Sequence, residues 1–186
     1  MEIKTGMISG ALSSCYLKTN KTSVICCIYL EQKGETEPQT EVHFSEGLPL
    51  QIRSGVSSIV KSLFSTKTRS TRIKVTFHAV RCGEDLFSCL VNSFSVCAIL
   101  SGIGIIDTIC SSTVYADKNN ISLTSQLNSF PLHMVYMIHK KRIMQVHFDG
   151  CLDSSLFVKA TERLVQTCVE QADMLRLTIE EITRTG

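Results

Sequence analysis

Basic side chains without acidic neighbours occupy residues 47–83, the stretch between Glu46 and Glu84. Lys and Arg bind phosphate oxygens whatever the base sequence, so such a stretch indicates contact with a nucleic acid. Basic residues on an edge strand also block aggregation, which is the alternative explanation for the same pattern. The seven residues concerned are Arg53, Lys61, Lys67, Arg69, Arg72, Lys74 and Arg81.

Cysteine and histidine do not occur at the spacings of a catalytic or metal site. The nine cysteines include no Cys-x-x-Cys pair, and His133 and His139 have no cysteines at zinc-ligand spacing. The count is odd and most cysteines lie in apolar runs, which predicts buried, reduced thiols. This spacing argues against a zinc site. We also predict no catalytic residue, no metal ligand and no cofactor. A hydrolytic site built on acids such as Asp107 is the open alternative.

The composition is typical of a globular protein, and we expect residues 1–186 to form a single domain. We also expect the protein to be intracellular. Hydrophobic residues make up 44% of the chain, and no Gly/Ser-rich or Pro-rich linker divides it. The net charge of +2 does not by itself demand a nucleic-acid partner. Residues 1–10 lack a basic segment followed by an apolar run, so we expect no secretory signal. The apolar stretches are shorter than a membrane span.

The first half of the chain predicts strands, one amphipathic helix and a further strand. Apolar residues at a 3.6-residue period predict a helix over 52–64. Alternation of apolar and polar residues predicts a strand over 72–80, after a basic loop at 65–70. Other strands are expected at 12–17, 24–30 and 40–44.

The second half begins with a helix that is apolar on most sides, over 86–98, as expected for a helix packed on a sheet. Asp85 is expected to cap it. Strands follow at 105–116, 121–123, 132–138 and 142–148, and the basic residues 140–142 are expected in a solvated turn. A long amphipathic helix runs from Asp153 to about Ile182. The order predicts an α+β fold of at least two layers, with mixed sheets packed on helices and a long C-terminal helix.

Three segments, in matching order and spacing, together resemble the RNase PH family, specifically a ring subunit of the eukaryotic RNA exosome. Residues 13–29 resemble the opening hairpin, with Thr22-Ser23-Val24 after a polar turn. Residues 41–44 followed by Gly47-Leu48-Pro49 resemble a strand and the break before the first helix. Residues 85–94 followed by Leu100-Ser101-Gly102-Ile103 resemble the central helix and its usual Ala-Gly-Ile end.

The sequence departs from this family at the positions that carry its chemistry. Active members hold phosphate with an Arg at the start of the central helix, where this chain has Leu86. A guanidinium binds phosphate through two donors, and Leu cannot. Active members also carry two carboxylates, which match Ser122 and Asn128 here. Neither side chain acts as an acid near neutral pH or holds a divalent metal well. The resemblance therefore implies a chain without phosphorolytic activity.

The resemblance implies a structural, RNA-binding subunit of a hetero-oligomeric ring in 3′-to-5′ RNA processing and decay, rRNA processing included. Its partners would be other RNase PH-like subunits, single-stranded RNA, and associated catalytic nuclease and cap subunits, in the nucleus, nucleolus and cytoplasm, with no membrane involved. In this family the basic loop faces the ring's channel. The RNA-binding candidates are therefore Lys67, Arg69, Arg72, Lys74 and Arg81.

Two alternatives remain open from the residues. One is a free-standing or homodimeric metal-dependent nuclease that acts on RNA or DNA. The other is a scaffold of the same fold that binds no nucleic acid.

Overall fold

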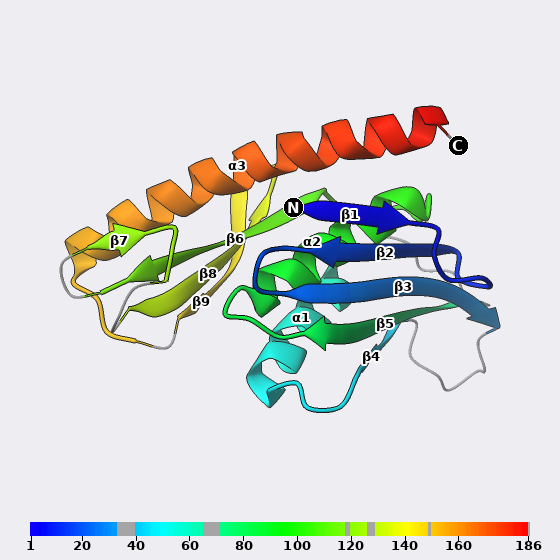
Figure 1. Cartoon of the computed structure of the whole chain (residues 1–186), viewed down its shortest axis with the longest axis horizontal. Coiled ribbons are helices and arrows are strands. Elements are labelled where there is room, and N and C mark those ends of the chain that lie inside the picture. The colour runs from blue at the N-terminus through cyan, green and yellow to red at the C-terminus, as the bar shows by residue number, and fades with distance from the viewer. Residues whose placement is uncertain (33–39, 65–70, 118–119, 126–128, 149, 186) are drawn as a thin grey trace. The chain divides into compact units, whose positions relative to one another are not determined.

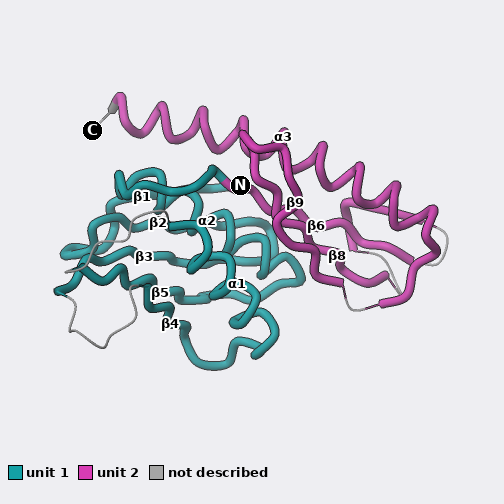
Figure 2. The backbone as a smooth tube through the Cα atoms, turned by 180° about the vertical axis from the view of Figure 1, so that it is seen from behind, with its two compact units in different colours: residues 1–108 teal, residues 109–186 magenta. Residues whose placement is uncertain are grey.

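The computed structural model describes residues 1–32, 40–64, 71–117, 120–125, 129–148 and 150–185. The chain forms two compact units, Met1–Thr108 and Ile109–Gly186 (Figure 2). The first contains β1 (Glu2–Thr5), β2 (Ser13–Lys18), β3 (Ser23–Gln32), β4 (Thr40–Phe44), α1 (Leu50–Leu63), β5 (Thr71–Arg81) and α2 (Leu86–Leu100). The second contains β6 (Ile109–Ala116), β7 (Ile121–Ser122), β8 (Phe130–Met137), β9 (Arg142–Phe148) and α3 (Ser154–Thr185).

The first unit is a five-stranded sheet with α1 and α2 on one face (Figure 1). The strand order is β1-β2-β3-β5-β4, in which β4 runs parallel to β5 and the other pairs are antiparallel. On β5, Ile73, Val75 and Phe77 are buried against the helices, as the predicted alternation requires. The sheet is mixed, as predicted.

Aromatic rings fill the space between this sheet and its helices. Phe77 stacks on Phe44 with ring centroids 5.2 Å apart, and lies 6.5 Å from Phe94 of α2. Phe64, at the end of α1, meets Phe94 edge to face at 5.7 Å. Residues 86–98 of α2 are all buried, which confirms the prediction of a central helix packed on a sheet.

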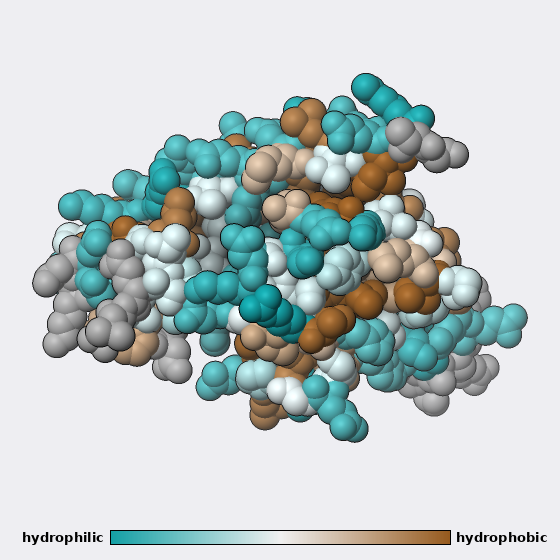
Figure 3. Space-filling view, in the orientation of Figure 1, coloured by the Kyte–Doolittle hydropathy of each residue, from teal (hydrophilic) through white to brown (hydrophobic). Residues whose placement is uncertain are grey.

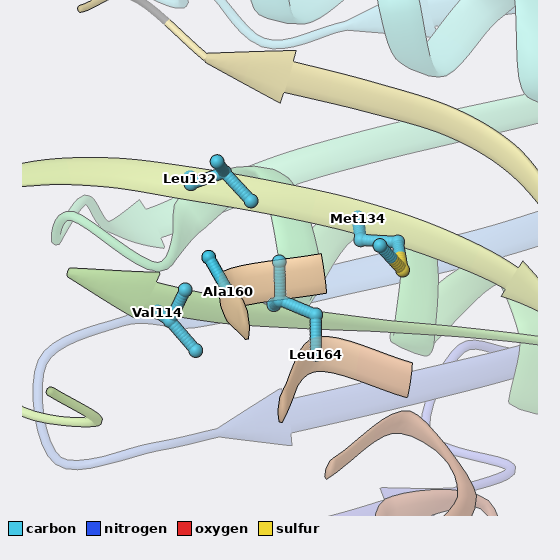
Figure 4. Packing of buried hydrophobic residues seen from close by; sticks show 5 residues of the cluster. All are labelled: Val114, Leu132, Met134, Ala160 and Leu164. Carbon is cyan, nitrogen blue, oxygen red and sulfur yellow. The ribbon is translucent and has the colours of Figure 1, made fainter. Parts of the chain in front are cut away.

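The second unit is a four-stranded antiparallel sheet in the order β7-β6-β8-β9, covered on one face by α3. Its core is a cluster in which β6 and β8 meet α3 (Figure 4). Asp153 begins the helix as predicted, because its carboxylate accepts hydrogen bonds from the backbone N–H and the hydroxyl of Ser155. The cluster consists of Val114, Leu132, Met134, Ala160 and Leu164.

The elements differ from the sequence-based expectations in three places. Strand β1 was not predicted, since its four residues show no apolar alternation beyond Ile3. Strand β6 begins at Ile109 and not at 105, because Ile105 and Ile106 pair with the end of α1 instead, and Ile106 N–H donates to the Leu63 carbonyl at 2.8 Å. Asp85 precedes α2, but its side chain makes no capping hydrogen bond to that helix.

The fold class is confirmed by this arrangement of two sheets and three helices. That residues 1–186 act as a single domain stays a prediction. None of the helices in the described part of the chain has the length and hydropathy of a membrane-spanning segment.

Candidate functional site

The side chains of Arg72 and Lys74 on β5 lie on the face of the first sheet that α1 and α2 leave uncovered. Strand alternation buries Ile73 and Val75 and turns Arg72 and Lys74 to the other face. Viewed from this side, hydrophilic and hydrophobic residues are mixed over the strands (Figure 3). The predicted RNA-binding residues of β5 are therefore on the surface, but their neighbours decide what they can bind.

Acidic residues from both adjacent strands pair with these cations. The sheet register places Arg72 opposite Glu31 of β3, and Lys74 beside Glu41 of β4. Arg72 forms ion pairs with Glu31 and, at 2.9 Å, with Glu41. Lys74 Nζ lies 3.1 Å from a Glu31 carboxylate oxygen. The hydrogen bonds from Arg72 and Lys74 hold the pKa of Glu31 below its usual range.

Counted over the described residues, the positive and negative charges of this cross-strand network balance. Two cations face two carboxylates, and Glu41 also contacts His43 Nε2 at 2.8 Å. The Arg72 side chain is only 19% exposed. A phosphate group would have to compete with carboxylates already in place, so Arg72 and Lys74 are weaker phosphate ligands than the acid-free stretch 47–83 indicates.

Among the described residues, the remaining RNA-binding candidate, Arg81, lies apart from this network. Arg81 ends the same strand nine residues beyond Arg72, roughly 30 Å away at the rise of an extended chain. It is exposed, and its guanidinium donates to the Asn20 carbonyl at 3.3 Å. Lys67 and Arg69 lie outside the described residues. Of the three candidates that the structure describes, it thus brings together Arg72 and Lys74.

Leu86 occupies the position where the resemblance expects a phosphate-binding Arg. It begins α2, and only 4% of its surface is exposed. Ser122 lies in β7 of the second unit, where its hydroxyl accepts a hydrogen bond from the Thr124 N–H at 3.1 Å. Asn128 lies outside the described residues. Neither Leu86 nor Ser122 supplies the positive charge or the acidic group that phosphorolysis would need.

A polar cluster that the sequence did not predict surrounds this end of α2. Asp85 accepts hydrogen bonds from the hydroxyls of Thr19, at 2.7 Å, and Thr22, both in the β2–β3 turn. The Thr22 hydroxyl also accepts from the Gly83 N–H at 3.0 Å. Burial and the Asp85 carboxylate raise the pKa of the nearby Cys89 thiol. The sequence did not reveal this cluster because more than 60 residues separate Thr19 and Thr22 from Asp85.

The cysteine, histidine and aspartate residues considered at the sequence level have structural surroundings. Seven cysteines are buried, whereas Cys82 and Cys151 are exposed. His133 is buried beside the Thr113 hydroxyl at 2.9 Å, and its ring stacks on that of His147. Asp107 is buried too. Within the described ranges, no group of three or more His, Cys, Asp or Glu side chains is placed to hold a metal ion.

Solved structures of exosome proteins share the fold of this chain. Rice (Oryza sativa) Rrp46 matches with a TM-score of 0.83 at 15% sequence identity, over 96% of this chain and 93% of that one. A chain of an archaeal exosome core matches with a TM-score of 0.71 at 14% identity, over 94% and 85%. A chain of the Archaeoglobus fulgidus exosome, solved with RNA bound to the active site, matches with a TM-score of 0.67 at 13% identity, over 93% and 87%.

These likenesses confirm the predicted RNase PH-like fold of exosome ring subunits, over both units of the chain. No protein-family model matches the sequence, and no curated protein does either. At 13–15% identity the likeness is one of fold, and residue roles must be argued from this chain's own side chains.

Proposed function

We propose that this chain is a non-catalytic subunit of an exosome-type ring that takes part in 3′-to-5′ RNA processing and decay. The observation that carries the proposal is the likeness to exosome chains over 93–96% of its length, combined with Leu86 at the phosphate-binding position. A protein that keeps the fold of an enzyme but lacks its catalytic and phosphate-binding side chains is suited to a structural role.

The proposed lack of catalysis rests on the environment of Leu86. This side chain is packed in the core at the start of α2, so the residue at the position that the resemblance assigns to phosphate binding carries no positive charge. The neighbouring Asp85 is held by two threonine hydroxyls. A carboxylate at that turn repels phosphate, which further disfavours phosphorolysis.

Fewer of the basic residues are proposed to bind RNA strongly than the sequence alone indicated. Arg72 and Lys74 are neutralised by Glu31 and Glu41, whereas Arg81 is exposed at the far end of β5. We assign the larger part of RNA binding to Lys67, Arg69 and Arg81, and a smaller part to Arg72 and Lys74. The contacts would be to phosphates and independent of base sequence.

The proposal includes partners and cellular location. Other RNase PH-like subunits would flank this chain in a hetero-oligomeric ring, since a closed ring gives each subunit two interfaces. Associated nuclease and cap subunits would supply catalysis and RNA entry. We expect the chain in the nucleus and nucleolus, and also in the cytoplasm.

Affinity purification of the tagged chain from cells, followed by mass spectrometry, tests the assembly. We expect several further RNase PH-like chains in stoichiometric amounts. Recovery of this chain alone, or with unrelated proteins, would contradict the ring. A parallel assay offers the purified chain labelled single-stranded RNA, inorganic phosphate and Mg²⁺. Release of nucleoside diphosphates would contradict the lack of phosphorolysis, and metal-dependent hydrolysis would favour a nuclease.

The RNA contact is tested by binding measurements at two salt concentrations. Replacing both Arg69 and Arg81 by Ala should weaken RNA binding. It should also reduce the slope of the logarithm of the binding constant against the logarithm of the salt concentration by about two, because the RNA then releases about two fewer counterions on binding. Lys61→Ala, which removes an exposed cation from α1, is the matched control and should leave binding unchanged. Equal losses in the two variants would indicate attraction by overall charge only.

A further inference from the structure

The turn between β8 and β9 carries a second group of basic side chains, which the proposed function does not use. It comprises residues 138–141, between Met137, the last residue of β8, and Arg142, the first residue of β9. Met137 and Arg142 pair across the hairpin. Four consecutive exposed residues lie at this end of the second sheet and include three cations: His139, Lys140, Lys141 and Arg142.

The strands of the second sheet supply no carboxylate to neutralise these cations. In the first sheet, glutamates on the neighbouring strands pair with Arg72 and Lys74. Strands β6, β7, β8 and β9 contain no Asp or Glu within their bounds. Among the described residues, none forms an ion pair with Lys141 or Arg142. These two cations are therefore available to a phosphate group, in contrast to those of β5.

The backbone of Lys141 lies in the left-handed region, with a φ of 51°. Glycine adopts this conformation without steric cost, whereas a residue with a Cβ atom is strained there. Strained residues of this kind are concentrated at binding sites, where the side chain is needed in spite of its cost to stability. A turn that served only to reverse the chain would be more stable with glycine at this position. The lysine side chain therefore indicates a binding function.

We propose that Lys141 and Arg142 bind the phosphate backbone of single-stranded RNA. This inference rests on the proposed RNA binding of the chain, and it adds a site in the second unit to the residues assigned above. Interfaces with nucleic acids are strongly positive, whereas the centres of protein–protein interfaces are depleted of charged residues. Adjacent cations without carboxylate partners fit an interface with nucleic acid. Lysine and arginine bind phosphates whatever the base, so we expect no sequence preference.

Lys141→Gly separates an RNA contact from a structural role, because it should change binding and stability in opposite directions. Loss of the cation should weaken the binding of labelled single-stranded RNA to the full chain. It should also reduce the slope of the logarithm of the binding constant against the logarithm of the salt concentration by about one. Relief of the left-handed backbone should meanwhile raise the urea concentration at the midpoint of unfolding. Lys141→Arg keeps both the charge and the strain, and should bind RNA like the unchanged chain.

Two further variants complete the binding experiment. Lys141→Gly combined with Arg142→Ala should reduce the same slope by about two, because two phosphate contacts are then lost. Lys159→Ala removes an exposed cation from α3 of the same unit and is the matched control, which should leave the slope unchanged. An equal loss in the control would show attraction by overall charge and overturn the site. So would a Lys141→Gly chain that binds RNA normally, or one that loses binding and stability together.

Comparison with the Arg69 and Arg81 double variant distinguishes this site from the proposed function. Weak binding by that variant, together with normal binding by the Lys141 and Arg142 double variant, would overturn this site alone. The reverse result would support this site and contradict the role assigned to Arg69 and Arg81. An unchanged chain that binds no RNA would overturn both. Labelled polyglutamate that binds the turn more tightly than RNA does would identify an acidic protein segment as the partner and overturn the assignment to RNA.

Discussion

Gly83 allows the turn before α2 to approach the β2–β3 turn closely. A Cβ atom at this position would lie 2.7 Å from the Lys21 Cβ and 2.7 Å from the Thr22 hydroxyl oxygen, and 2.9 Å from the Lys21 carbonyl. The Gly83 N–H donates to that same hydroxyl, and Lys21 forms an ion pair with Glu84 at 2.9 Å. The absence of a side chain therefore lets Asp85 reach its threonine partners.

Gly83→Ala should lower the free energy of unfolding by about 2 kcal/mol, because an added methyl group in a packed site displaces backbone as well as side chains. Urea denaturation followed by circular dichroism measures the loss. Cys82→Ala changes the exposed neighbouring residue and should shift stability by less than about 0.5 kcal/mol. A Gly83→Ala variant as stable as the unchanged chain would show that the two turns separate without cost.

At the scale of secondary-structure elements, the ion-pair network joins three strands of the first sheet. Glu31 of β3 and Glu41 of β4 meet at the side chains of β5 that lie between them. The network couples the antiparallel β3–β5 pair to the parallel β5–β4 pair. These ion pairs stabilise the strand register from the face that α1 and α2 do not cover. On that face, none of the described apolar side chains is buried against the two helices to fix the register.

The pKa of Glu31 is lowered in the folded chain, by its hydrogen bonds to Arg72 first and to Lys74 next. A carboxyl group whose pKa is lowered by folding stabilises the fold above its ordinary pKa and loses this effect as pH falls through the folded value. Glu31→Gln should therefore be less stable than the unchanged chain at pH 7. The difference should shrink below about pH 4, the ordinary titration range of glutamate.

Denaturant titrations of both chains at several pH values check this prediction. Glu162→Gln, an exposed position on α3, is the matched control. A stability difference for Glu31→Gln that stays constant down to acid pH would mean that the lost carboxylate acts through packing and not through its charge.

At the scale of the whole molecule, each unit has its own sheet, helix cover and buried cysteines. Burial raises the pKa of the Cys26 and Cys97 thiols, which lowers their reactivity further. The buried set is Cys15, Cys26, Cys27, Cys89 and Cys97 in the first unit and Cys110 and Cys168 in the second. Reaction of these thiols therefore reports the unfolding of each unit separately.

A thiol reagent should modify two cysteines in the native chain, Cys82 and Cys151, and all nine in strong denaturant. If residues 1–186 are one cooperative domain, the seven buried thiols should become reactive together as denaturant rises. Mass spectrometry of the modified chain counts them. Release of five thiols from the first unit and two from the second at different denaturant concentrations would contradict a single domain.

The sequence by itself determined the fold class and most of the elements. Strand alternation on β5 and the apolar content of α2 are local properties of the chain, so the predictions at 72–80 and 86–98 agree with the structure. The resemblance to the RNase PH family rested on motifs of the same local kind, and the shared fold confirms it.

Only the tertiary structure decided what the basic stretch faces. In the sequence, no acid lies between Glu46 and Glu84, yet the sheet register brings Glu31 and Glu41 to Arg72 and Lys74. The hydrogen bonds of Asp85 to Thr19 and Thr22 were hidden for the same reason. Charge and hydrogen-bond partners depend on distances in space, and strand pairing joins residues that sequence spacing keeps far apart.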